Sequence, residues 1–142
     1  MAREKRILVV EDDEPIRALL FTVLRRRGFR VDTATNGREA TERLNRCNYS
    51  LVLLDLMMPE IDGFEFLTAL RHNEAWQSIP VVVLTSKDLS AEERQLLSGN
   101  VEKILQKGAY SREALLREVR RAVARYAGRP PDEGGTPAGG RR

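Results

Sequence analysis

Charged and hydroxyl side chains follow four apolar segments of the sequence. In chain order, the residues that follow each segment are Glu11, Asp12 and Asp13 after Ile7–Val10, Asp55 after Leu51–Leu54, Thr85 and Ser86 after Val81–Leu84, and Lys107 after Val101–Leu105. If these segments are parallel strands of one sheet, their carboxyl ends lie at the same edge, where open α/β sheets bind ligands. The sequence therefore predicts an acidic site that also holds a hydroxyl and an ammonium group.

Carboxylates gathered at one edge repel one another, so the pKa of at least one of them would rise unless positive charge lies nearby. Lys107 supplies one such charge. The remaining donors are oxygens, with no histidine or second cysteine beside them, and this set is typical of a hard divalent cation such as Mg²⁺. Asp55 would then stay ionised and could attack a phosphoryl group whose oxygens contact Lys107 and Thr85. The predicted product is an aspartyl phosphate.

Length and composition restrict the other classes of function. The chain has 142 residues, 42% of them hydrophobic, which suits one globular domain better than two. We expect a cytoplasmic protein, because no apolar segment approaches the roughly 20 residues of a membrane helix and no signal peptide precedes the first strand. The net charge of +3 comes from arginines interleaved with glutamates, so we expect no direct nucleic-acid binding. The first acidic turn lacks a glycine-rich phosphate loop, which disfavours dinucleotide and flavin cofactors.

Helical segments separate the strands. Apolar side chains recur every three or four residues in Ile16–Leu24, Phe64–Leu70 and Leu115–Tyr126. Further helix boundaries are indicated by Pro15, by Asn36 as a cap, by the capping-box pair Ser90 and Glu93, and by Gly28, after which residues 29–34 alternate like a half-exposed strand. Strand and helix thus alternate five times. This order predicts an α/β fold with a doubly wound five-stranded parallel sheet covered by helices on both faces.

The composition changes near the end of the chain. Residues 128–142 are rich in glycine and proline and poor in apolar side chains, so we expect a flexible tail or the start of a linker there. Residues 1–127 are expected to form the folded domain. Its one cysteine, Cys47, has no partner for an internal disulfide and is expected to fill space beside apolar neighbours.

The acidic segments closely resemble the receiver domain of two-component response regulators, the CheY-like superfamily. The segments that carry the resemblance, within about residues 5 to 127, are Val9–Asp13, Leu53–Gly63, Val82–Ser86 and Lys107. Each of them alone is common, but the four in this order and spacing are specific. The resemblance implies a (βα)₅ sheet of flavodoxin-like strand order 2-1-3-4-5. It also implies a phosphorylation-operated signal receiver, not an enzyme, that serves a two-component system or phosphorelay.

By the same resemblance, Asp55 accepts the phosphoryl group from a histidine kinase or phosphotransfer protein. The implied Mg²⁺ ligands are Asp55, Asp12, Glu11 through a water molecule, and the backbone carbonyl of Met57. Thr85 would be the switch hydroxyl and Lys107 the phosphate partner, and the modification would change a surface that a downstream protein binds. Asp13 lies one residue beyond the acidic pair and is expected to cap the first helix.

Three positions bear on how the signal is kept and passed on. Ile104 stands where the family usually has an aromatic residue three positions before the lysine, and Gly108 stands where a proline usually follows it. Both departures weaken the expected transmission of the signal from the site to the rest of the domain. Met57, two residues after the acceptor, offers no hydrogen bond to an attacking water, so we hypothesise slow self-dephosphorylation.

The residues leave two alternative functions open. Ile104 and Gly108 favour an interaction domain that keeps the fold and works without phosphorylation. A phosphatase that passes through an aspartyl phosphate would need a second aspartate two residues after the nucleophile, where this chain has Met57. The sequence identifies neither the cognate kinase, the target nor the oligomeric state. Because no room for an output domain follows residue 127, we expect either a stand-alone receiver or a segment of a larger chain such as a hybrid kinase.

Overall fold

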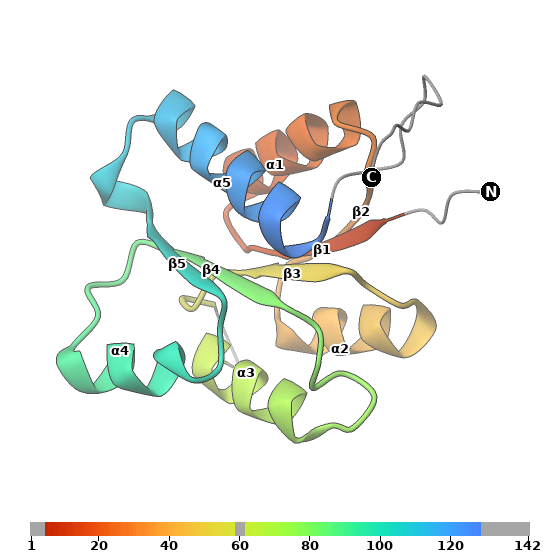
Figure 1. Cartoon of the computed structure of the whole chain (residues 1–142), viewed down its shortest axis with the longest axis vertical. Helices are drawn as coiled ribbons and strands as arrows, with labels where there is room; N and C mark the ends of the chain where they lie inside the picture. The colour runs from red at the N-terminus through yellow and green to blue at the C-terminus, as the bar shows by residue number, and fades with distance from the viewer. Residues whose placement is uncertain (1–4, 59–61, 129–142) are drawn as a thin grey trace.

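The computed structural model describes residues 5–58 and 62–128, and in this part of the chain strands and helices alternate strictly (Figure 1). In chain order the elements are β1 (Arg6–Val10), α1 (Glu14–Arg26), β2 (Arg30–Ala34), α2 (Gly37–Arg46), β3 (Leu51–Leu54), α3 (Gly63–His72), β4 (Val81–Thr85), α4 (Ala91–Ser98), β5 (Lys103–Gln106), the 3₁₀ helix η1 (Lys107–Ala109) and α5 (Arg112–Tyr126). None of the described helices is long and apolar enough to cross a membrane. The expected tail falls almost entirely outside the described residues.

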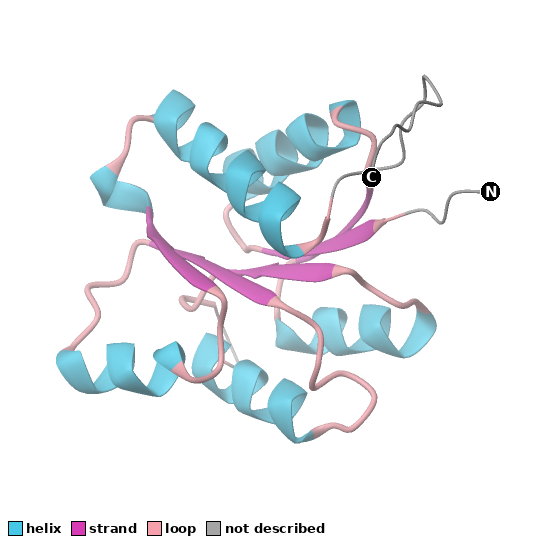
Figure 2. Cartoon of the chain, viewed as in Figure 1, coloured by secondary structure: helices cyan, strands magenta, loops and turns pink. Residues whose placement is uncertain are grey.

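The strands form one parallel sheet in the order β2-β1-β3-β4-β5. The predicted fold class and strand order are therefore confirmed. Helices α1 and α5 cover one face of the sheet, and α2, α3 and α4 cover the other (Figures 1 and 2). This three-layer arrangement follows from right-handed crossovers between parallel strands.

The core lies on both faces of the sheet, and β3 and β4 are therefore buried along their whole length. One apolar cluster joins alternate strand residues such as Ile7 and Leu53 to α1 and α5, and the other joins residues such as Leu8 and Leu54 to the opposite helices. Side chains that alternate between two buried faces explain why these strands are continuous apolar runs in the sequence. The half-buried Cys47 packs against the second cluster, as expected.

Local capping signals set the helix boundaries. The side chains of Asp13, Asn36 and Ser90 accept hydrogen bonds from the backbone three residues ahead, and Ser90 forms the expected capping box with Glu93. Gly28 has a φ of 99° just after α1, where the chain needs a left-handed residue to leave the helix. These sequence-based predictions are confirmed.

One local expectation differs from the structure. The last strand begins at Lys103 instead of Val101, because the amides of Asn100 and Val101 still bond to the carbonyl of Leu97 at the end of α4. In α4 only Leu97 is buried, whereas Leu96 is 54% exposed. Gly63 is the first residue of α3.

Candidate functional site

The sheet continues one residue past the ends of β1 and β3, and this extension carries two acidic side chains to its edge. The amide of Glu11 donates to the carbonyl of Ala34 (2.9 Å), and the amide of Asp55 donates to the carbonyl of Val10 (3.0 Å). Asp55 and Glu11 therefore leave neighbouring strands at nearly the same height. Thr85 ends β4 on the other side of β3, and Lys107 follows β5 directly.

Four of the predicted site residues meet at this edge. Carboxylate oxygens of Glu11, Asp12 and Asp55 lie within 4.8 Å of one another. Lys107 Nζ lies 2.8 Å from Glu11 Oε1 and 3.2 Å from Asp55 Oδ2. Glu11 and Asp55 are only 1% and 4% exposed, whereas Asp12 lies at the surface. The site is thus a buried acidic pair with an ammonium group between its members and a third carboxylate at the opening.

Burial and close charges perturb the protonation of this group. Burial, followed by the hydrogen bond with Asp55, raises the pKa of Glu11 from 4.5 to about 8, although Lys107 acts in the opposite direction. Burial alone would lower the pKa of Lys107, but the neighbouring Glu11 and Asp55 outweigh it and raise that pKa. One ammonium group therefore does not neutralise the cluster, and the pocket is short of positive charge.

The donors of the pocket fit a hard divalent cation. The three clustered groups are all carboxylates, which is the oxygen-only set that Mg²⁺ prefers. Glu11 Oε1 is buried and, among the described residues, accepts no hydrogen bond; its contact with Lys107 is an ion pair without hydrogen-bond geometry. Such an oxygen is available to a metal ion or to a metal-bound water molecule.

Of the remaining predicted residues, Met57 contacts Asp55, and Thr85 lies at the end of the neighbouring strand β4. The amide of Met57 donates to Asp55 Oδ1 (3.0 Å), and the side chain of Met57 is 50% exposed. Ser86 Oγ lies 3.5 Å from the sulfur of Met57. Thr85 is fully buried, and its hydroxyl oxygen accepts a hydrogen bond from the amide of Lys87 (3.1 Å). A water molecule approaching Asp55 beside Met57 would therefore pass an apolar side chain.

The loop between β1 and α1 contains one contact that the sequence did not predict. Arg17, in the second turn of α1, reaches back and donates to the backbone carbonyls of Glu11 (3.0 Å) and Asp12 (3.4 Å). Asp13 caps the same helix, as expected, through its bond from the amide of Ile16. The only available sequence signal was the position of Arg17 four residues after a capping aspartate, which is too common to indicate a role.

The two positions that depart from the family pattern lie on β5 and just after it. Ile104 is half-buried and packs against the cluster that faces α3 and α4. Gly108 lies in the exposed 3₁₀ turn η1, where an added Cβ would meet nothing within 4 Å. Neither position offers an aromatic ring or a ring-constrained backbone near Lys107.

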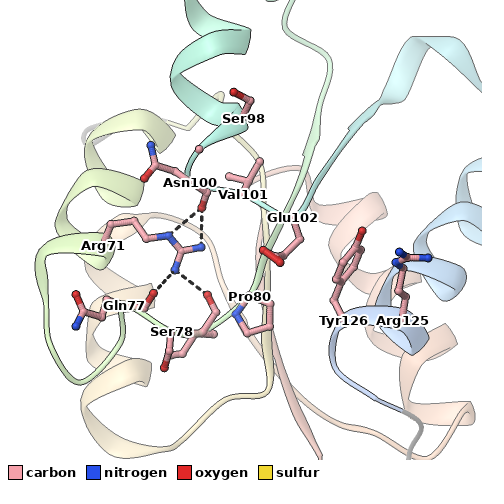
Figure 3. Close-up of a pocket in the computed structure, with 12 residues that line it drawn as sticks. Arg71, Gln77, Ser78, Pro80, Ser98, Asn100, Val101, Glu102, Arg125 and Tyr126 are labelled. Carbon is pink, nitrogen blue, oxygen red and sulfur yellow. Dashed lines mark hydrogen bonds between the residues drawn. The ribbon is translucent and has the colours of Figure 1, made fainter.

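A hollow of about 530 Å³ lies at the opposite, amino-terminal edge of the sheet (Figure 3). Arg71, from the end of α3, donates four hydrogen bonds to backbone carbonyls: two to Asn100 (2.8 and 2.6 Å), one to Gln77 (2.8 Å) and one to Ile79 (2.8 Å). These bonds join the loops that precede β4 and β5. Arg71 therefore holds these two loops together at the edge of the sheet opposite the acidic site.

Comparison with known proteins places this geometry in a family. The model of the response regulator receiver domain matches residues 7–120. The chain belongs to this family. In this receiver, the matched region contains all four strand ends that form the acidic pocket. Receiver domains are signal receivers that act in two-component systems.

Related proteins of known sequence or structure agree. The chain is 39% identical over 114 residues to the transcriptional regulatory protein ResD of Bacillus subtilis, which covers 80% of this chain and 46% of ResD. The receiver thus spans about half the length of the curated relatives it matches. The response regulator TrrA of Thermotoga maritima, solved with Mg²⁺ and BeF, is 34% identical with a TM-score of 0.67, over 82% of this chain and 97% of that one.

A magnesium-bound relative also shares the fold. The receiver domain of the sensor histidine kinase PA1611 of Pseudomonas aeruginosa was solved with a magnesium ion in its active-site cleft. It is 25% identical, with a TM-score of 0.75 over 89% of this chain and 99% of that one. Related receiver domains thus hold a divalent ion in the active site, and in this receiver Glu11, Asp12 and Asp55 form the acidic group that could bind one.

Proposed function

We propose that this receiver accepts a phosphoryl group on Asp55 in a Mg²⁺-dependent reaction and thereby switches a protein-binding surface. One observation carries the proposal: Lys107 Nζ lies between Glu11 and Asp55, 2.8 Å from an oxygen of the first and 3.2 Å from an oxygen of the second. An ammonium group placed there can contact a phosphoryl oxygen as soon as Asp55 is modified. Asp55 is buried enough to exclude most water and lies at the edge where a donor can reach it.

In the proposed transfer, an Asp55 carboxylate oxygen attacks phosphorus, and the bond from phosphorus to the donor atom breaks in line with the new bond. Glu11, Asp12, Asp55 and the carbonyl of Met57 would hold Mg²⁺, which when bound neutralises charge on the phosphoryl oxygens. Lys107 contacts one of these oxygens. The Thr85 hydroxyl contacts another after it gives up the amide of Lys87, which changes the loop that leads into α4.

A histidine kinase or phosphotransfer protein donates the phosphoryl group in the cytoplasm, and a downstream protein binds the switched surface without direct contact to nucleic acid. The receiver turns over no metabolite.

Residues 1–127 form the domain and residues 128–142 a tail or linker, so brief proteolysis should remove only the tail. Cleavage inside residues 1–127 at a similar rate would contradict this boundary.

Intact mass measurement after incubation with acetyl phosphate tests the proposal. In Mg²⁺ buffer the protein should gain the mass of one phosphoryl group, and neither the Asp55→Asn variant nor the wild type with a chelator should gain it. Asp62→Asn is the matched control, because Asp62 caps α3 outside the acidic pocket and should leave the adduct intact. An adduct that persists in Asp55→Asn would place the acceptor elsewhere.

The same experiment distinguishes a second function. Ile104 and Gly108 lack the features that usually transmit the switch, and this favours an interaction domain that works without phosphorylation. Absence of any adduct in the wild type would support that function. Continuous release of inorganic phosphate at a catalytic rate would instead indicate a phosphatase.

A further inference from the structure

The loop between β1 and α1 carries two of the predicted metal ligands, Glu11 and Asp12. The amide of Glu11 donates to the carbonyl of Ala34 on β2, whereas the carbonyls of Glu11 and Asp12 accept from a side chain of α1. Arg17 Nη1 donates to both of these carbonyls, at 3.0 and 3.4 Å. The two peptide groups on either side of the Asp12 Cα are thus held by one half-buried guanidinium.

Asp12 depends on this backbone support more than its neighbours do. Within the described part of the chain, its exposed carboxylate forms no hydrogen bond and no ion pair, whereas Glu11 and Asp55 are held by burial and by Lys107. The direction of the Asp12 side chain is therefore set by the orientation of its own two peptide groups. A donor that fixes both of them also restricts where the carboxylate can lie.

We propose that Arg17 is a positioning residue for the metal site, which orients Asp12 toward the ion through the carbonyls of Glu11 and Asp12. The inference rests on the proposed function, because it takes Asp12 to be a metal ligand. Arg17 itself is fixed from the same loop: its amide donates to the carbonyl of Asp13 (2.9 Å), and Asp13 caps the helix. Residues that orient ligands from outside the coordination sphere are a regular part of metal sites.

The charge and the geometry of Arg17 act on metal binding in opposite directions. As a cation close to the pocket, Arg17 repels a divalent ion, so loss of its charge alone would strengthen binding. As a donor to the loop, it holds a ligand in place, so loss of its hydrogen bonds would weaken binding. The direction of the change in affinity therefore separates a positioning residue from a merely adjacent charge.

Titration of the purified full chain with Mn²⁺, monitored by the EPR signal of the free ion, tests the inference. Arg17→Met should bind Mn²⁺ on the order of 10-fold more weakly than the wild type, the lower end of what such outer residues contribute. Arg17→Lys keeps the charge but not the planar guanidinium, and it should also bind more weakly. Amide hydrogen exchange at Asp12 and Asp13 should be faster in the metal-free Arg17→Met protein.

Arg25→Met is the matched control. Arg25 lies on the same helix, but its guanidinium rests 5.5 Å from the ring centre of Phe21, in the last turn away from the loop. This variant should bind Mn²⁺ like the wild type. Urea unfolding without metal verifies that each variant is folded at the titration temperature.

The outcomes separate the inference from the proposed function. Equal or tighter Mn²⁺ binding by Arg17→Met, with a wild type that binds, would overturn the positioning role alone. A wild type that binds no Mn²⁺ would overturn both. Weaker binding by both Arg17 variants, with Arg25→Met unchanged, would establish the positioning role.

Discussion

At the scale of single residues, Glu11 determines how the pocket responds to pH. Its pKa in the folded, metal-free protein is raised from 4.5 to about 8, chiefly by burial. Between these two values the folded state keeps a proton that the unfolded state releases. The free energy of unfolding therefore falls as pH rises through this window, by at most about 1.4 kcal/mol per pH unit.

The Glu11→Gln variant should lack this pH dependence, because the amide is neutral throughout. In urea unfolding with a chelator present, the free energy of unfolding of the variant should increase relative to that of the wild type as pH rises. Little further change is expected above the raised pKa of Glu11. A parallel pH dependence of the two proteins would contradict the shift.

Met57 governs the predicted lifetime of the phosphoryl group. Its half-exposed side chain borders Asp55 and offers no donor or acceptor able to orient a water molecule. We expect the phosphorylated wild type to lose its label slowly in Mg²⁺ buffer, and Met57→Asn to lose it several-fold faster. Met57→Leu, which keeps an apolar side chain, should behave like the wild type. Loss of the wild-type label within seconds would contradict the hypothesis.

At the scale of elements, the start of α3 is packed directly against the loop that carries Asp55. A Cβ on Gly63 would lie 2.5 Å from Leu56 Cα and 2.9 Å from the carbonyl oxygen of Asp55. Gly63→Ala should therefore lower the free energy of unfolding by about 1–3 kcal/mol and slow phosphorylation, since the backbone beside Asp55 must move.

Gly99→Ala is the control for this substitution. An added Cβ at Gly99 meets nothing within 4 Å, and its φ of −91° is open to any residue. Urea unfolding should place this variant within about 1 kcal/mol of the wild type. Equal effects of the two substitutions would show that the close approach at Gly63 carries no cost.

Arg71 links three elements at the opposite edge of the sheet, through the four hydrogen bonds drawn in Figure 3. Arg71→Gln should lower the free energy of unfolding by about 1–3 kcal/mol, because backbone carbonyls lose a charged donor. Hydrogen exchange should increase in the loops before β4 and β5. Arg94→Gln, on the exposed face of α4, should change neither quantity.

At the scale of the whole molecule, Mg²⁺ should stabilise the domain, because its ligands come from loops after two neighbouring central strands that meet only in the folded state. Mg²⁺ at 100 times its dissociation constant should add about 2.7 kcal/mol to the free energy of unfolding. Asp55→Asn should lose most of this gain. The control Asp62→Asn should keep it, and thermal unfolding with and without a chelator measures both.

The sequence determined the architecture because its signals are local and periodic. Apolar runs such as Leu51–Leu54, caps such as Asp13 and the left-handed Gly28 each specify an element or its end without help from distant residues. Strict alternation of strands and helices then restricts the topology to a doubly wound parallel sheet. The convergence of Glu11, Asp12, Asp55 and Lys107 follows from that topology alone.

The contacts of those side chains depend instead on how distant segments pack together. The raised pKa of Glu11, the close approach at Gly63 and the reach of Arg17 to two carbonyls depend on distances between segments that the periodicity of the sequence does not encode. The same holds for Leu96 and Leu97, where the rotation of α4 against the sheet decides which leucine is buried. Sequence patterns specify elements, whereas contacts depend on how packed elements lie against one another.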